Sequence, residues 1–259
     1  TTGLLPLFSL NEVGYKKIIE LSSRSYLNND EISDPHLDIN DLLKLDSSGI
    51  SIFSGTVFGL FGKLFDKGKF SEITNLYKLL NKNFNNRFYL EIQRHNDQNE
   101  KSFEKFNLTQ SSNLQIPIIA TNEVFYLTKD MHEAHDALTC IGNKSYVNDK
   151  NRIKYTSEHY LKNNIEMSDL FADIPEALEN NYNFSLRCNF RPLFSKPILP
   201  NISTSKDGDA NDIIKKESLS GLKEKFIKFF DLKKNVLEKN EKYLAYKDRL
   251  DHELEIIIK

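Results

Sequence analysis

Residues 155–162 read YTSEHYLK, and residues 167–178 read MSDLFADIPEAL. The second segment has the chemistry of a helix N-terminus. The Asp173 carboxylate can accept hydrogen bonds from the free N–H groups of a first turn, and Pro175 fits a position that needs no donor. Glu176 complements the positive end of the helix dipole. The pattern predicts a helix over residues 174–188 with Asp173 as its cap.

Towards the N-terminus, apolar runs typical of strands alternate with amphipathic segments typical of helices. Strands are expected at residues 4–10, 50–53, 87–93 and 116–121. Helices are expected at residues 12–27, 39–45, 70–84 and 99–111. Four strands separated by helices predict an α/β fold with parallel βαβ packing, either an open sheet or part of a barrel.

After about residue 130 the strand signals stop, and helices are expected at residues 131–141 and 157–162 before the one at 174–188. Prolines 192, 197 and 200 predict an extended connector over residues 190–202. Long charged helices follow at residues 210–230 and 239–258. The predicted domains are therefore residues 1–203 and residues 204–259.

Composition limits the kind of protein this can be. The 35 basic and 37 acidic residues give a formal charge of −2, so no overall positive field would concentrate DNA around the chain. No apolar run reaches the roughly 20 residues that cross a bilayer. The cysteines, Cys140 and Cys188, are expected as buried free thiols in a reducing compartment. A cytoplasmic protein with no membrane contact is expected.

Three further segments extend the pattern of the opening stretch: FYLEIQRH at 88–95, IIATNEVFYL at 118–127 and AHDAL at 134–138. Together these segments resemble the later part of the polymerase and histidinol phosphatase (PHP) domain of bacterial DNA polymerase III α subunits. The resemblance covers roughly residue 6 to the C-terminus. It implies a partial PHP-type (β/α) barrel followed by long helices that lead towards the polymerase palm or thumb region.

The resemblance also implies a parent protein that performs DNA replication by template-directed nucleotidyl transfer with Mg²⁺. Its expected partners are the proofreading exonuclease subunit, other replicase subunits and DNA. This chain has no His-x-His motif, which the family carries on its first strand, so the chain is expected to begin inside the domain. No catalytic residue is expected in it.

PHP domains hold two or three metal ions and hydrolyse phosphoesters. His95 matches a family histidine at a strand end, and Glu123 stands where aspartate is usual, so these two are expected as residual metal-ligand positions. Thr56 replaces the usual cysteine and Phe125 the usual histidine, and neither supplies an equivalent ligand. A degenerate site without cofactor is therefore expected, with Zn²⁺ or Mn²⁺ bound only if the site functions.

Two alternatives remain beside a polymerase fragment. One is an interaction scaffold that docks the exonuclease, and the other is an active metal-dependent PHP phosphoesterase. The other histidines are expected in ordinary roles: His132 and His135 on a helix surface or in helix packing, and His159 exposed to solvent or capping a helix.

Overall fold

The computed structural model describes residues 1–27, 34–194, 196–198, 209–230 and 239–258. The chain divides into two compact units, Thr1–Pro192 and Leu193–Lys259. The predicted domain boundary between residues 203 and 204 lies outside the described residues and stays a prediction.

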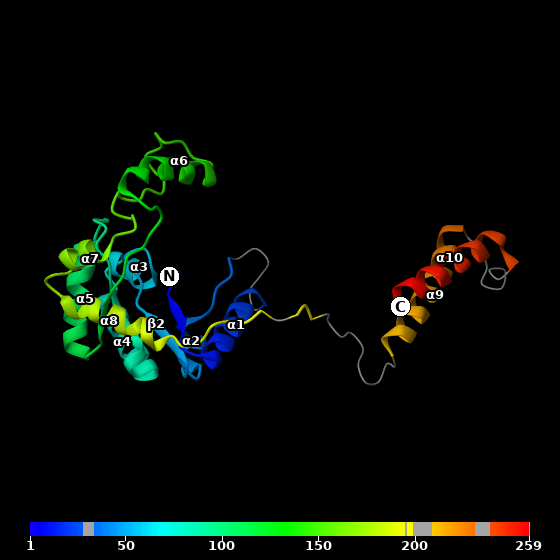
Figure 1. Cartoon of the computed structure of the whole chain (residues 1–259), viewed down its shortest axis with the longest axis horizontal. Coiled ribbons are helices and arrows are strands. Elements are labelled where there is room, and N and C mark those ends of the chain that lie inside the picture. The colour runs from blue at the N-terminus through cyan, green and yellow to red at the C-terminus, as the bar shows by residue number, and fades with distance from the viewer. Residues whose placement is uncertain (28–33, 195, 199–208, 231–238, 259) are drawn as a thin grey trace. The chain divides into compact units, whose positions relative to one another are not determined.

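The first unit is built on a four-stranded sheet in the order β1 (Leu7–Ser9), β2 (Ile50–Phe53), β3 (Phe88–Ile92) and β4 (Ile118–Ala120) (Figure 1). Strands β2, β3 and β4 are parallel, as predicted. The expectation of parallel packing was wrong for β1, which pairs antiparallel with β2. The chain after β1 turns at once into α1 (Glu12–Leu27), and Gly14 of that helix lies against Gly49 just before β2. A Cβ at Gly14 would come within 1.8 Å of the Gly49 carbonyl oxygen, so the crossing needs glycine.

The other helices of this unit connect the strands or follow them. They are α2 (Ile39–Lys44), α3 (Leu60–Asp66), α4 (Phe70–Phe84), α5 (Glu100–Leu114), α6 (His132–Gly142), α7 (Asn164–Leu170) and α8 (Pro175–Arg187), with short 3₁₀ turns at Asn85–Arg87 and Lys129–Met131.

Two expectations for the opening segment were wrong. Residues 157–162 form a turn and a β-bridge between Tyr126 and Tyr160 instead of a helix. The next helix starts at Asn164, where Asn163 and Glu166 form a capping box. Helix α8 forms as predicted with Pro175 in its first turn, but Asp173 does not cap it. The Asp173 carboxylate instead accepts two hydrogen bonds from Arg94, at 2.6 and 2.8 Å.

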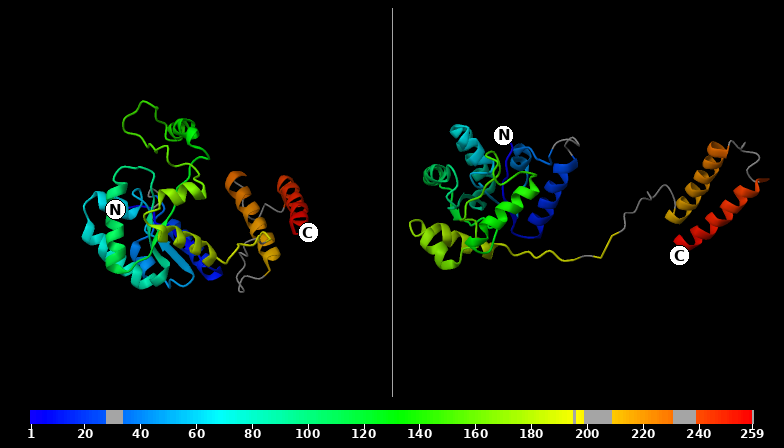
Figure 2. Two further views of the ribbon diagram at one scale, coloured as in Figure 1. Left: turned by 60° about the vertical axis from the view of Figure 1, so that its left-hand side comes forward. Right: turned by 90° about the horizontal axis from the view of Figure 1, so that it is seen from above.

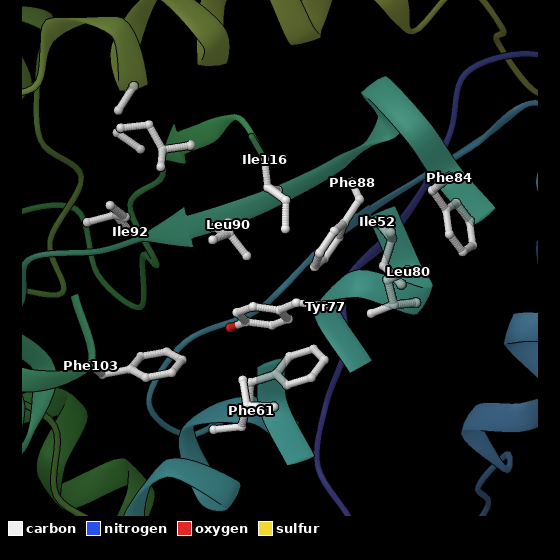
Figure 3. Packing of buried hydrophobic residues seen from close by; sticks show 14 of the residues in the cluster. Ile52, Phe61, Tyr77, Leu80, Phe84, Phe88, Leu90, Ile92, Phe103 and Ile116 are labelled. Atoms are coloured by element: carbon white, nitrogen blue, oxygen red, sulfur yellow. The ribbon is translucent and has the colours of Figure 1, made fainter. Parts of the chain in front are cut away.

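The main hydrophobic core lies between one face of the sheet and helices α3 to α5. Figure 3 shows Tyr77 of α4 among Phe61, Phe88 and Leu90, and all four side chains are fully buried. The Tyr77 hydroxyl donates to Asn107 Oδ1 of α5 at 3.0 Å, which pairs the polar end of the ring. Burial raises the pKa of Tyr77, so the phenol stays neutral.

Helix α8 covers the opposite face of the sheet and its β4 edge. Phe184 packs against Phe53, Tyr89 and Ile119 on that face. The Asn180 and Asn181 amides donate to the Ile118 and Ala120 carbonyls at 2.8 and 2.7 Å. These amides pair carbonyl groups that a further strand would otherwise bind.

The second unit contains α9 (Ala210–Phe230) and α10 (Glu241–Ile258), close to the predicted bounds. Phe226 and Tyr243 are buried where the two helices pack, with ring centroids 5.4 Å apart. Among the described helices of the whole chain, none is long and apolar enough to span a bilayer. The cysteine expectation was half right, because Cys140 is buried and Cys188 is exposed.

Candidate functional site

The candidate site lies at the carboxyl ends of β3 and β4. Residues 93–97 follow β3 and residues 121–125 follow β4, and the parallel pairing of the two strands brings these ends together. A third segment, residues 155–160, lies against them. Polar groups at this edge of a parallel sheet are well placed to meet a ligand.

Two buried histidine rings form the centre of the site. His95 and His159 are 1% and 0% exposed, and their rings stack with centroids 4.1 Å apart and planes 5° from parallel. His95 Nε2 lies 3.0 Å from Asn122 Oδ1, and His159 Nε2 lies 3.2 Å from Asp97 Oδ2. The expectation of an exposed or capping His159 was therefore wrong.

Backbone contacts explain why His159 is buried. The Phe125 N–H donates to the His159 carbonyl at 2.9 Å, and the Thr156 hydroxyl donates to the His95 carbonyl. These two bonds hold residues 155–160 against both strand ends. The buried position of His159 thus comes from pairing between distant segments.

Carboxylates surround the two rings. Glu100 accepts from the backbone N–H groups of His95 and Asn96, at 2.8 and 2.7 Å. Its Oε1 lies 3.7 Å from His95 Nδ1, and Glu123 Oε2 lies 3.7 Å from His159 Nδ1. Both Nδ1 atoms are buried without a hydrogen-bond partner among the described residues.

His95, Asp97 and His159 form a possible metal-binding group, because one ligand atom from each lies within 4.8 Å of the others. The ring geometry limits this group. A bound ion lies about 2.1 Å from an imidazole nitrogen, along a lone pair in the ring plane. Two parallel, stacked rings keep their lone pairs in separate planes, so one ring must rotate before a single ion can bind both.

Comparisons with known proteins connect this site to a family. Residues 2–95 match the PHP domain family. DNA polymerase III subunit alpha of Rickettsia bellii is 35% identical to this chain over 252 residues, which are 97% of this chain and 21% of the relative. The subunits of Borreliella burgdorferi and Pseudomonas aeruginosa are 34% and 31% identical, over 98% of this chain. The chain is homologous to part of the DNA polymerase III α subunit.

The predicted resemblance and fold class are confirmed by these matches. The chain spans about a fifth of the length of the α subunits that it matches. The PHP match ends at His95, so Glu123, Phe125 and His159 lie beyond the matched residues.

The structure places the four predicted site residues in different surroundings. His95 is in the buried ring stack, and Glu123 is half-buried with its Oε2 3.7 Å from His159 Nδ1. Thr56 lines a cavity of about 10 Å³ with Glu91 and Glu100. The Phe125 ring lies 4.3 Å from Tyr155, 5.1 Å from His159 and 5.3 Å from His135, measured between centroids.

Sequence reasoning missed Asp97 and His159 as members of this group. Asp97 follows His95 by two residues, and this spacing next to a strand end was a usable signal. His159 gave no such signal, because its place depends on the contacts of residues 155–160 with both strand ends.

Glu91 is a buried carboxyl next to the site. Its Oε1 accepts from Thr121 and Gln93, while its Oε2 has no partner among the described residues. Burial raises the pKa of Glu91 above its ordinary value of 4.5. The fold therefore favours the protonated acid.

We expect Glu91→Gln to raise the melting temperature at pH 7. A carboxyl whose pKa is raised by folding destabilises the folded state as pH rises through its ordinary pKa, and the full penalty is present above the raised value. The gain should therefore shrink as pH falls from the raised pKa towards the ordinary value of 4.5, and it should vanish below that value. Thermal unfolding across pH 4 to 8 tests this, with Glu133→Gln on exposed α6 as the control. An equal gain at every pH would contradict the assignment.

Proposed function

We propose that this chain is a supporting and docking part of a DNA polymerase III α subunit. The observation that carries the proposal is similarity to α subunits at 31–35% identity over 97% or more of this chain. The whole protein then synthesises DNA on a template, with Mg²⁺ ions held by residues outside this chain. The cytoplasmic location and the DNA contact expected from the sequence follow from that role.

Primer extension tests whether DNA synthesis needs residues outside this chain. The purified chain alone should not extend a primed template, whereas an α subunit that contains it should. A chimera is a direct assay: this chain replaces the corresponding segment of the Borreliella burgdorferi subunit, which is 34% identical. Loss of extension in a folded chimera would count against the proposal.

The PHP pocket of this chain is proposed to lack the multinuclear metal cluster. Support comes from Thr56 and Phe125, which offer no replacement for thiolate and imidazole ligands, and from the parallel stack of His95 on His159. Losing two ligands cannot be offset by the groups that orient those remaining. No residue here is assigned a catalytic role.

Metal analysis tests this part of the proposal. After a chelator wash and incubation with Zn²⁺ or Mn²⁺, the chain should retain well under one equivalent, and chelator should not change its melting temperature. One or more equivalents in the wild type that disappear in His95→Ala would contradict it.

The PHP part of this chain is proposed to bind the proofreading exonuclease and other replicase subunits. Residues 127–154, here called the arm, project from the first unit around α6 (Figures 1 and 2). Large apolar side chains of the arm are exposed, namely Leu127, Leu138, Ile141, Tyr146, Val147 and Ile153. Grouped exposed apolar side chains are typical of protein-binding surfaces.

A binding assay with the exonuclease subunit tests docking. The α subunit that contains this chain should form a complex with it, and Ile141→Asp on the arm should weaken the complex. Tyr182→Asp is a matched control, because Tyr182 is also exposed but belongs to α8. Equal weakening by both variants would argue against the arm, and no complex at all would argue against docking.

A metal-dependent phosphoesterase is the second candidate, and the His95, Asp97 and His159 group favours it. Such an activity needs a bound ion to activate water or polarise a phosphoryl oxygen. Hydrolysis of a phosphomonoester with added Mn²⁺, abolished by His95→Ala, would support this candidate over the docking role.

A further inference from the structure

A second concave region lies at the opposite ends of the same strands. A cavity of about 490 Å³ opens where the chain enters β3 and β4. Its lining includes Asn86, Tyr89, Ser112, Asn180 and Arg187, and its lining side chains comprise one cation and no acid. It is therefore separate from the histidine site at the carboxyl ends of these strands.

Arg187, the last residue of α8, is held in a fixed orientation. Its Nη1 donates to the Asn86 carbonyl at 2.9 Å and to the Tyr89 hydroxyl. Within the described part of the chain, no acceptor meets its Nε or Nη2 atoms. The free edge of the guanidinium thus presents two parallel N–H donors, an arrangement that matches two oxygens of a carboxylate or phosphate.

Hydroxyl groups add donors elsewhere in the lining. The Tyr89 oxygen accepts from Arg187, and its own hydrogen has no acceptor among the described residues. The hydroxyl of Ser112, an exposed residue of α5, also has no side-chain partner within the described ranges. The lining therefore offers unpaired donors together with one formal positive charge.

We propose that this cavity binds a small molecule through an oxyanion group, with the Arg187 Nε and Nη2 donors on two of its oxygens. The cavity volume falls in the range of about 300–1,000 Å³ that is usual for small-molecule sites. Phosphate and carboxylate share this recognition chemistry, and the experiment below distinguishes them. The inference does not depend on the proposed function.

The test is a titration of the whole chain followed by amide NMR spectra, with inorganic phosphate in one series and acetate in the other at constant ionic strength. We expect saturable shifts at residues 86–89, 111–117 and 187 in one series. Saturation by phosphate alone would assign a phosphoryl ligand, and saturation by acetate alone would assign a carboxylate. Linear, unsaturated shifts in both series would overturn the proposal.

Ser112→Asp separates binding from folding. Ser112 is exposed and its side chain makes no contact that the fold needs, so the variant should fold normally. A negative charge beside the bound anion should weaken binding roughly tenfold by direct repulsion. Ser102→Asp is the control, because Ser102 is exposed on the same helix but outside the lining. Equal affinity in the two variants would overturn the proposal.

Arg187→Lys tests whether binding needs the two parallel N–H donors of the guanidinium. Lysine keeps the charge but loses the paired donors, so affinity should fall while the Ser102→Asp control stays unchanged. Unchanged affinity in a folded Arg187→Lys protein would show that charge alone attracts the anion and would overturn the assignment.

Discussion

Replacing Arg94 with alanine is expected to lower the free energy of unfolding by about 3 kcal/mol, the low end of the usual loss for a buried ion pair, because this pair is only partly buried. Arg94 follows β3 and lies at the junction of α5, α7 and α8. It bonds both oxygens of Glu104, at 3.1 and 2.6 Å, and both oxygens of Asp173. It also donates to the Leu170 carbonyl at 2.6 Å and covers the Phe171 ring at 4.8 Å.

The size of this effect follows from what remains after the substitution. The Glu104 side chain is only 16% exposed, so its carboxylate would stay largely buried without a partner. The Asp173 side chain is 62% exposed and would regain water, so it contributes less. Urea unfolding of the first unit measures the loss. Arg24→Ala is the control, because its ion pair with Glu20 is exposed and should cost under about 0.5 kcal/mol.

The same contacts predict a pH dependence. Hydrogen bonding to Arg94 holds the pKa of Asp173 below its ordinary value of 3.8. A carboxyl with a lowered pKa stabilises the fold fully above its ordinary pKa, and this contribution is lost as pH falls through the lowered value. Wild type should therefore lose stability in acid more steeply than Arg94→Ala. Parallel acid titrations would contradict the assignment.

Replacing Phe125 with alanine is expected to cost about 2 kcal/mol, less than the 3–5 kcal/mol of a fully buried phenylalanine because this ring is half-buried. The ring joins the site to the arm through Tyr155, His135 and His159. His159 in turn stacks on His95. Without the Phe125 ring, the ring contacts through Tyr155 and His135 are lost, while the His95–His159 stack and the hydrogen bonds remain.

Hydrogen exchange locates the change. Amides over residues 122–162 should exchange faster in Phe125→Ala, including the Leu161 N–H that donates to Tyr126 at 3.0 Å. Tyr146→Ala is the matched control, since that ring is 79% exposed and should change stability by less than about 0.5 kcal/mol. Faster exchange throughout the sheet, with no preference for the arm, would contradict the proposed role of the ring.

Strong local periodicity made much of the fold predictable. The predicted bounds of α1, β2, α4 and α9 coincide with those observed. In α4 the apolar residues follow a clear helical period. Residues 157–162 failed for the opposite reason. The segment is short, and the burial of His159 and Lys162 within it depends on strand ends far away in the chain.

The candidate site was less predictable than the fold. His95 was predicted from its match to a family histidine, but its stacking partner His159 lies 64 positions further along and depends on a connection that no periodic pattern describes. The role of Asp173 was wrong for a related reason. A carboxylate one residue before a predicted helix is a reasonable cap, but Arg94 offers a charged, two-point partner that binds it more strongly.

The two asparagine side chains at the border of β4 have a consequence for self-association. Because the Asn180 and Asn181 amides already donate to the Ile118 and Ala120 carbonyl oxygens, a strand of another copy cannot form hydrogen bonds with these oxygens. Within the described residues, the β1 border is the remaining place for such growth. Crowded or heated samples should therefore begin to aggregate by intermolecular pairing at β1.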